Sequence, residues 1–201
     1  MYQSGFRQND CAVYQLAEMY NHVSSCLDKG REVKAIFFDI KSAFDRVWHR
    51  GLIHKLNSIG IRNGVLDLLK NYLSNRSQSV IINNESSAFK NIYSGVPQGS
   101  VLGPLLFLIV INDITNEIIS RLRLFADDTS LFLVIDNPPP PDTLNTLNND
   151  LKKIHDWSEK WKVEFNPNKT ISLTFSRKNN PTLLVASFND IPLYDTNTHK
   201  H

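Results

Sequence analysis

The chain has 201 residues, of which 41% are hydrophobic and 21% charged, with a net charge of +2. This length and composition are typical of one globular domain with a substantial core, and they exclude a disordered chain. The net charge is too mild to identify nucleic acid as a partner, because domains that bind duplexes usually show a clear basic excess. Charge alone therefore leaves the partners open.

Simple residue patterns exclude several kinds of site and location. The two cysteines, Cys11 and Cys26, lack the spacing of a zinc site or a disulfide framework, and the histidines form no HExxH pattern. No charged-then-apolar leader opens the chain. The most apolar run, residues 101–111, is far shorter than the ~20 residues that a membrane span needs. We therefore expect an intracellular protein, nuclear or cytoplasmic, that is not secreted and contacts no membrane.

A helix and a buried strand are predicted in the first part of the chain. Apolar residues at helical spacing predict the helix from about Asn9 to Asp28. Residues 33–40 are almost continuously apolar, which predicts a strand buried on both faces in the centre of a sheet. Asp39 lies near the end of this strand, and a buried carboxylate is costly unless it is paired or bound to a metal. Asp39 therefore needs a partner.

Helices and a β-hairpin are predicted in the middle of the chain. Asn83 and Asn84 are typical hairpin turn residues, and Pro104 suits the first turn of a helix. We expect two helices at about residues 50–56 and 64–73. The hairpin is expected at residues 77–93, and a third, apolar helix at residues 101–111.

Residues 122–133 predict two short apolar strands joined by a pair of aspartates. Asp127 and Asp128 suit a turn, because aspartate bonds its own backbone, and a turn explains most Asp-Asp pairs seen alone. Together with Asp39, however, three carboxylates at neighbouring strand ends would form an oxygen-rich site suited to Mg²⁺. We expect Asp127 at a strand end as the partner of Asp39, and Asp128 on the turn in a weaker, more replaceable role.

The last part of the chain predicts a helix and one more strand. A polyproline stretch, residues 138–141, precedes a strongly amphipathic helix over about residues 144–161. A turn at Asn166 leads to a strand at residues 171–175, and after Asn179 no clear closing element is predicted. The whole pattern predicts an α+β fold with a mainly antiparallel sheet and helices packed on one face.

Five stretches of the chain resemble successive motifs of reverse transcriptases: residues 3–7, 37–45, 95–104, 125–128 and 157–170. They follow one another in the family's order and at suitable spacing. The residues of these motifs most resemble those of the enzymes of non-LTR retrotransposons, the LINE-like elements, which include the jockey type. The resemblance implies a polymerase palm with part of the fingers over residues 1–176. Residues 177–201 would be a truncated C-terminal segment before the missing primer grip and thumb.

The resemblance implies that Asp39, Asp127 and Asp128 bind metal and are catalytic. Two-metal phosphoryl transfer needs carboxylates from separate elements to hold two Mg²⁺ ions about 3.5–4 Å apart, with Mn²⁺ as a substitute. Lys169 matches a lysine suspected of protonating the pyrophosphate leaving group. On the residues alone, solvated turn carboxylates and an exposed turn lysine remain the alternatives.

Three further residues match the family's nucleotide-binding positions. Phe44 matches the bulky side chain beneath the sugar of the incoming nucleotide, where a ring would clash with a 2′-OH and favour dNTPs. Gln98 matches the residue that touches this sugar, and Gly99 would let the backbone approach the substrate closely. On the residues alone, a core phenylalanine is the preferred explanation of Phe44, and a loop entering a helix explains Gln98 and Gly99 equally well.

The implied function is RNA-directed DNA polymerase activity, which transfers dNTPs onto a DNA primer over an RNA template. The remaining fingers and thumb, and an endonuclease, would belong to a longer parent protein. Two alternatives stay open. An RNA-dependent RNA polymerase or a nucleotide cyclase could use the same palm, although Phe44 argues against an rNTP substrate. The chain could also be a catalytically incomplete retroelement remnant that has no activity on its own.

Overall fold

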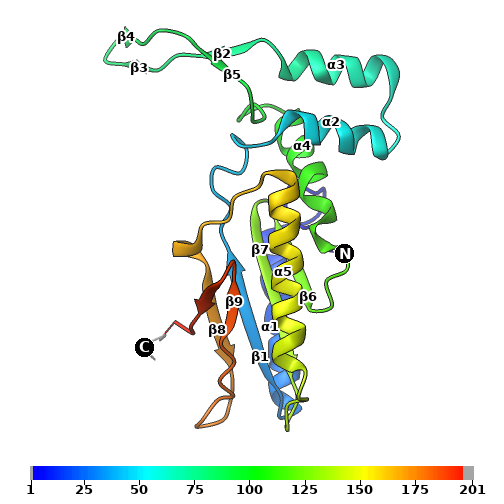
Figure 1. The fold of residues 1–201 in the computed structure, drawn as a ribbon, viewed down its shortest axis with the longest axis vertical. Helices are drawn as coiled ribbons and strands as arrows, with labels where there is room; N and C mark the ends of the chain where they lie inside the picture. The colour runs from blue at the N-terminus through cyan, green and yellow to red at the C-terminus, as the bar shows by residue number, and fades with distance from the viewer. Residues whose placement is uncertain (1, 197–201) are drawn as a thin grey trace. The chain divides into compact units, whose positions relative to one another are not determined.

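The structure, a computed structural model, describes residues 2–196 (Figure 1). The chain divides into two compact units. The first, which we call the sheet unit, contains the chain up to Lys41, residues 113–160 and the chain from Glu164 onward. The second, the helical unit, contains residues 42–112 and 161–163. Each unit is described by itself, and the boundary predicted after residue 176 stays a prediction.

The sheet unit is built on a four-stranded antiparallel sheet with the strand order β6-β7-β1-β8. Its strands are β1 (Glu32–Phe38), β6 (Arg121–Phe125), β7 (Asp128–Ile135) and β8 (Ile171–Phe175). β1 is an inner strand, and its residues Val33, Ala35 and Ile36 are 0% exposed. This confirms the strand that the continuous apolar run predicted, buried on both faces.

Helix α1 (Ala12–Asp28) covers one face of this sheet. Its residues Met19 and Cys26 pack in one apolar cluster with Ala35 of β1 and Phe132 of β7. Other apolar residues of α1 point elsewhere, since Tyr20 is 76% exposed. The helix predicted from about Asn9 to Asp28 is confirmed over Ala12–Asp28.

Helix α5 (Thr143–Trp161) covers the opposite face. Phe38 points away from α1 and contacts the ring of Phe188 at 5.2 Å between centroids, and Phe188 contacts His155 of α5 at 6.1 Å. Figure 1 shows α5 in front of the sheet and α1 behind it. The predicted α+β class is confirmed, with the difference that helices cover both faces instead of one. The reason is that β1 is apolar on both sides and needs cover on both.

A short hairpin that the sequence did not predict follows β8. Strands β9 (Ala186–Phe188) and β10 (Ile191–Leu193) pair through a turn at Asn189 and Asp190, whose φ angles are 51° and 59°. Phe188 anchors the hairpin against Phe38 and Phe165. Each strand has only three residues, which is too short to show a periodic pattern.

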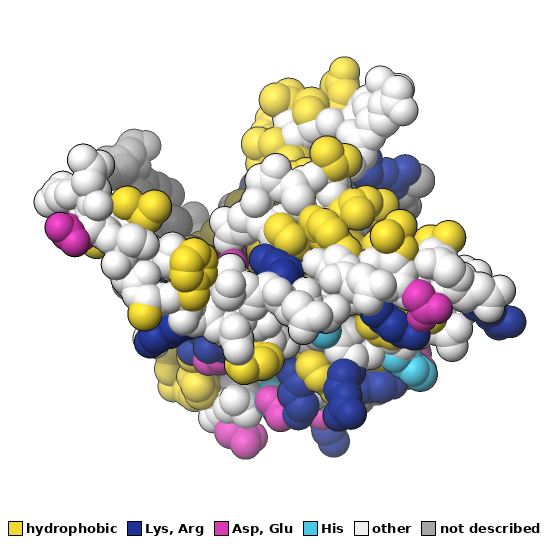
Figure 2. Space-filling model, turned by 90° about the horizontal axis from the view of Figure 1, so that it is seen from above, with side chains coloured by type: hydrophobic (Ala, Val, Ile, Leu, Met, Phe, Trp, Pro, Cys, Tyr) yellow, Lys and Arg dark blue, Asp and Glu magenta, His cyan; other side chains and the backbone are white. Residues whose placement is uncertain are grey.

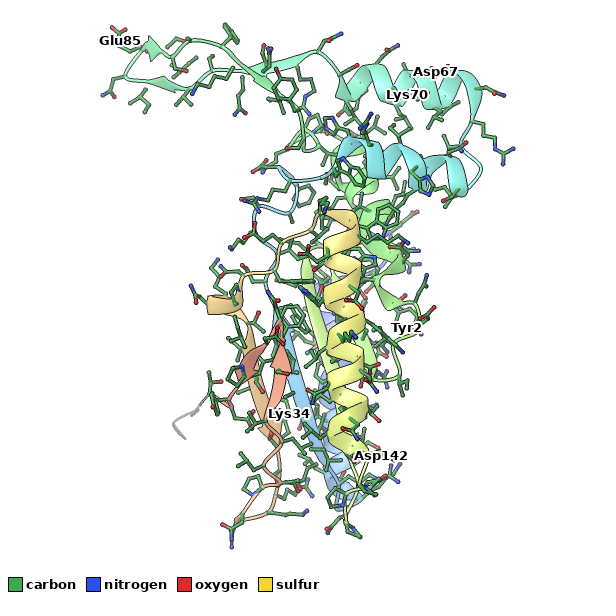
Figure 3. All side chains as sticks on the ribbon, in the orientation of Figure 1. Tyr2, Lys34, Asp67, Lys70, Glu85 and Asp142 are labelled. Atoms are coloured by element: carbon green, nitrogen blue, oxygen red, sulfur yellow. The ribbon has the colours of Figure 1, made fainter. Side chains whose placement is uncertain are left out.

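Buried charges of β1 tie the C-terminal segment to the sheet. Lys34, labelled in Figure 3, is 1% exposed and forms an ion pair with Asp195. Glu32 is also 1% exposed and accepts hydrogen bonds from Lys178 Nζ at 2.8 Å and from the Thr182 amide at 3.0 Å. Each buried charge has a partner, as burial requires.

Glu32 makes the stability of the fold depend on pH. Burial alone would raise the pKa of Glu32, but hydrogen bonds from Lys178, Ser176 and Thr182 outweigh burial and lower the pKa from 4.5 to about 2. The ionised form therefore stabilises the folded chain above pH 4.5, and this contribution of roughly 3 kcal/mol is lost as the pH falls from 4.5 towards 2.

We expect urea unfolding to show this contribution as a difference between wild type and Glu32→Gln. The free energy of unfolding should be lower for Glu32→Gln at pH 7, and the difference should shrink steadily below pH 4.5. Glu85→Gln is the matched control, because Glu85 is exposed on a hairpin (Figure 3). A difference between wild type and Glu32→Gln that is the same at pH 7 and pH 3 would contradict the assignment.

The helical unit contains three helices and a long β-ribbon. The helices are α2 (His49–Ser58), α3 (Asn63–Leu73) and α4 (Leu102–Ile111), and α2 packs against the other two. The ribbon contains β2 (Arg76–Gln78), β3 (Ile81–Ile82), β4 (Glu85–Ser86) and β5 (Lys90–Ile92). Its turn residues Asn83 and Asn84 have φ angles of 50° and 64°, which confirms the predicted hairpin.

Apolar side chains lie on the surface of both units, and Figure 2 shows many of them on one face of the molecule. In the helical unit the exposed ones include Leu68, Ile81 and Tyr93. Among the residues that the structure describes, no helix has the length and apolar character that crossing a membrane requires. Two short 3₁₀ helices complete the fold, at Asn112–Thr115 and Pro167–Lys169.

Candidate active site

Asp39 and Asp128 lie at the same end of the sheet, where β1 finishes and β7 begins. β1 and β7 pair in a register that places Phe37 opposite Ser130 and Phe38 opposite Thr129. Asp39 follows the last residue of β1 and Asp128 is the first residue of β7, so the same register continued by one residue sets them opposite each other. Because residues directly opposite each other in an antiparallel pair share a face, these two carboxylates are neighbours.

Asp127 lies in the turn beside them. Phe125 of β6 pairs with Asp128 of β7, so Ala126 and Asp127 form a two-residue turn between the strands. This confirms the predicted hairpin. It reverses the predicted placement of the two aspartates, because Asp128 begins the strand and Asp127 occupies the turn. Sequence alternation could not settle this, since it does not show at which residue the strand pairing starts.

Asp128 lies within the electrostatic influence of the other two carboxylates. The pKa of Asp128 is raised, first because burial disfavours its charged form and then because Asp127 and Asp39 add negative charge nearby. Oxygen donors and concentrated negative charge are what a hard divalent cation binds, so the residues fit such an ion in their chemistry. Among the described residues, however, no three His, Cys, Asp or Glu side chains converge on one point that could hold a metal ion.

A return of the chain places Lys169 beside Asp39. The Asn166 amide donates to the carbonyl of Asp39 at 2.7 Å, and the Lys41 amide donates to the carbonyl of Glu164 at 2.8 Å. The 3₁₀ helix that follows Asn166 then brings Lys169 Nζ to 3.6 Å from Asp39 Oδ2. The lysine side chain is 66% exposed, so it is both an exposed turn lysine and a neighbour of the acidic cluster.

A cavity adjoins Asp128 within the sheet unit. It has a volume of about 430 Å³ and lies between the N-terminal half of α1 and the end of the sheet. Its lining includes Asp128, Phe37, Phe125, Leu16 and Met19, and it is mostly apolar. Asp128 is therefore accessible from a space large enough for part of a substrate.

In the helical unit, Phe44 and Gln98 are held together. The Val96 amide donates to the carbonyl of Phe44 at 2.8 Å, and Gln98 Nε2 donates to Asp45 Oδ1 at 3.0 Å. The Phe44 ring, which is half-buried, packs on Phe107 of α4 with 4.9 Å between centroids. The ring is therefore held against α4, and the Val96 amide holds the backbone of the same residue.

Gly99 follows Gln98 with a φ of +76°, a backbone conformation that residues with a side chain rarely adopt. A Cβ at Gly99 would meet nothing within 4 Å. Glycine is therefore favoured here by the backbone conformation. Within the described chain, no close contact would exclude a side chain at this position. Close approach of a substrate to Gly99 stays a prediction.

The predicted site residues thus form two groups. The sheet unit brings together Asp39, Asp127, Asp128 and Lys169, while the helical unit brings together Phe44, Gln98 and Gly99. Sequence reasoning missed two residues that hold these groups in place. Asp45 binds Gln98, and Gln3 binds the backbone of Ala126. Both lie in stretches that resemble family motifs, and this was the only available signal.

A family model described as reverse transcriptase (RNA-dependent DNA polymerase) matches residues 1–184. The chain belongs to this family. Its curated relatives are RNA-directed DNA polymerases of non-LTR retrotransposons, as the sequence resemblance implied. The chain is 30% identical to the probable RNA-directed DNA polymerase from transposon X-element of Drosophila melanogaster, over 100% of the chain and 22% of that protein. It is 32% identical to the RNA-directed DNA polymerase from mobile element jockey of Drosophila funebris, over 87% of the chain and 20% of that protein.

Solved structures of telomerases share the fold of this chain. The apo telomerase of Candida tropicalis matches 88% of the chain and 37% of its own, with a TM-score of 0.58 and 15% identity. The telomerase of Candida albicans, solved with a fragment of telomeric RNA, matches 90% of the chain and 32% of its own, with a TM-score of 0.60 and 14% identity. These similarities confirm the palm-type fold. The chain spans only about a fifth of the length of the curated relatives given above.

Proposed function

We propose that this chain carries the catalytic palm of a non-LTR retrotransposon reverse transcriptase, which extends a DNA primer with dNTPs over an RNA template. The observation that carries the proposal is the strand register, which sets Asp39 beside Asp128 at one end of the sheet. The turn with Asp127 lies next to this pair. In a chain of this family, carboxylates grouped in this way are the expected centre of nucleotidyl transfer.

In this proposal Asp39, Asp127 and Asp128 hold two Mg²⁺ ions, for which Mn²⁺ can substitute. Bound there, the ions would activate the attacking hydroxyl of the primer and stabilise the charge that develops on the phosphate. The pKa of Asp128 is raised first by burial and then by the negative charge of Asp127 and Asp39, and this second cause supports the assignment because a cation would neutralise that charge. Lys169 would donate a proton to the departing pyrophosphate, and its ammonium group at 3.6 Å from Asp39 supports that role.

In the helical unit, Phe44 and Gln98 would contact the sugar of the incoming nucleotide. The hydrogen bond between Gln98 and Asp45 supports this pairing, because it holds the amide beside the residue that follows Phe44. The packing of Phe44 on Phe107 supports a steric role, because a ring held by a helix cannot easily move aside for a 2′-OH.

The proposed partners are an RNA template, a DNA primer and dNTPs. RNA bound to the Candida albicans telomerase is in line with this, although that similarity concerns the fold alone. Because the curated relatives are about five times longer, we infer that further fingers, a thumb and an endonuclease belong to a longer parent protein. We also infer an intracellular location, in the nucleus or the cytoplasm.

Primer extension by the purified chain tests the proposal. The reaction contains an RNA template, a DNA primer, dNTPs and Mg²⁺, and the Asp127→Ala protein is run alongside. We expect incorporation by the wild type that requires Mg²⁺ and disappears in the variant. No incorporation by a folded wild-type chain would contradict the proposal for this chain and favour the catalytically incomplete remnant.

A further inference from the structure

The first residues of the described chain lie along the edge of β6. The Leu124 amide donates to the carbonyl of Tyr2 at 2.7 Å, and the Ser4 amide donates to the carbonyl of Leu124 at 2.9 Å. Gln3 and Leu124 thereby form a parallel bridge, and Figure 3 marks Tyr2 at the start of this segment. The segment thus runs beside the strand that leads into the turn at Ala126 and Asp127.

The Gln3 side chain is bonded to the backbone of that turn. Its Nε2 donates to the carbonyl of Ala126 at 3.1 Å, and its Oε1 accepts from the Ala126 amide at 2.9 Å and from the Gly5 amide at 2.7 Å. The residue is 9% exposed. The Gln3 side-chain amide therefore satisfies both the N–H and the C=O of Ala126, as the backbone of a neighbouring strand would.

Ala126 needs this support. Its φ is 54°, in the left-handed region that a non-glycine residue rarely adopts. The residue is also buried, so its amide and carbonyl would be costly to leave without partners. Loss of the Gln3 amide would therefore favour a different turn, and Asp127, the next residue, would move with it.

Gly5 lets the segment come this close. A Cβ at Gly5 would lie 2.2 Å from the Ala126 nitrogen, and this neighbour is backbone that cannot swing away. The contact therefore excludes any larger residue at this position unless the turn or the segment shifts.

We propose that Gln3 and Gly5 are positioning residues that hold the Ala126–Asp127 turn, and with it Asp127 and Asp128, in place beside Asp39. The catalytic consequence rests on the proposed function. A small displacement of catalytic groups is sufficient to slow a reaction strongly, since about 1 Å of misplacement can cost about 100-fold.

The test compares Gln3→Met with wild type and with Gln8→Met. Methionine keeps the length and volume of glutamine but cannot form the hydrogen bonds, and Gln8 is an exposed glutamine of the same segment. Hydrogen exchange of the Ala126 amide is measured by NMR, and Mn²⁺ affinity by electron paramagnetic resonance of the free ion. Primer extension gives kcat and KM at a temperature where thermal melting finds all three proteins folded. Gly5→Ala is a second variant that perturbs the same turn by volume alone.

We expect the Ala126 amide to exchange at least about 10-fold faster in Gln3→Met, because the bond to Oε1 is lost. Mn²⁺ should bind more weakly, and kcat should fall by about 10- to 100-fold while KM for the primer–template changes little. Gly5→Ala should act in the same direction, and Gln8→Met should behave like wild type.

A Gln3→Met protein with wild-type exchange at Ala126, or with wild-type Mn²⁺ affinity and kcat, would overturn the proposal. A merely structural role would lower the melting temperature and leave the other readouts unchanged, which would also overturn it. A wild-type chain that incorporates no nucleotide would count against the proposed polymerase instead. The exchange and Mn²⁺ measurements would then decide the positioning role by the same criteria.

Discussion

Asp39→Ala and Asp127→Ala are each expected to abolish Mg²⁺-dependent incorporation, with a loss of at least about 100-fold in kcat, whereas Asp128→Ala retains measurable activity. Each substitution removes a carboxylate from the group that would hold the ions. The order among them keeps the roles expected from the sequence, with Asp39 and Asp127 as partners and Asp128 as the more replaceable carboxylate, although Asp128 and not Asp127 begins the strand. Single-turnover primer extension at saturating dNTP measures the loss.

Asp142→Ala is the matched control for this series. Asp142 is an exposed aspartate of the sheet unit, labelled in Figure 3, and we expect the variant to keep wild-type activity. The strand register sets Asp128, and not Asp127, directly beside Asp39, so the reverse order is a real alternative. Equal losses in all three variants, or a larger loss in Asp128→Ala than in Asp127→Ala, would refute the proposed division of roles.

Phe44→Ala is expected to admit rNTPs. Removing the ring frees the space that a 2′-OH would occupy, and steric discrimination of this kind is worth about 10- to 100-fold. The measurement is the ratio of kcat/KM for a dNTP to that for the matching rNTP, which should fall by this factor in the variant. The dNTP reaction itself should remain detectable, because no metal-binding residue is changed.

Phe89→Ala is the control for the loss of an aromatic ring, since Phe89 is a 74% exposed phenylalanine of the same unit. The packing of Phe44 on Phe107 means that Phe44→Ala also removes a contact to α4, so thermal melting accompanies the kinetics. An unchanged preference for dNTPs in a folded Phe44→Ala protein would remove the gate role. The ring would then be a packing residue of the helical unit.

Local patterns were sufficient for the parts of the fold that depend on neighbouring residues. The apolar run of β1, the hairpin around the two aspartates, the turn at Asn83 and Asn84 and the period of α5 were all predicted and are confirmed. Each depends on side-chain alternation, helical period or turn preference, which act within a few residues. The family was likewise recognised from short motifs in the right order.

Local patterns did not predict the pairings between segments that lie far apart in the chain. The placement of Asp127 in the turn, the β9–β10 hairpin and the cover of both sheet faces all depend on which strands meet and in what register. The Gln3 amide is the clearest case, because its partner, Ala126, lies 123 residues away.

The sequence by itself determined the family and the antiparallel α+β class, and it named the residues that we propose to bind metal and nucleotide, because these inferences follow from residue type, order and local period. Only the tertiary structure decided which carboxylate stands beside Asp39, that Lys169 approaches it, and what holds the turn of Asp127. The physical reason is that a strand's period of two fixes which residues share a face but leaves open which residue of another strand lies opposite. That choice is made by packing and hydrogen bonds between segments far apart in the chain.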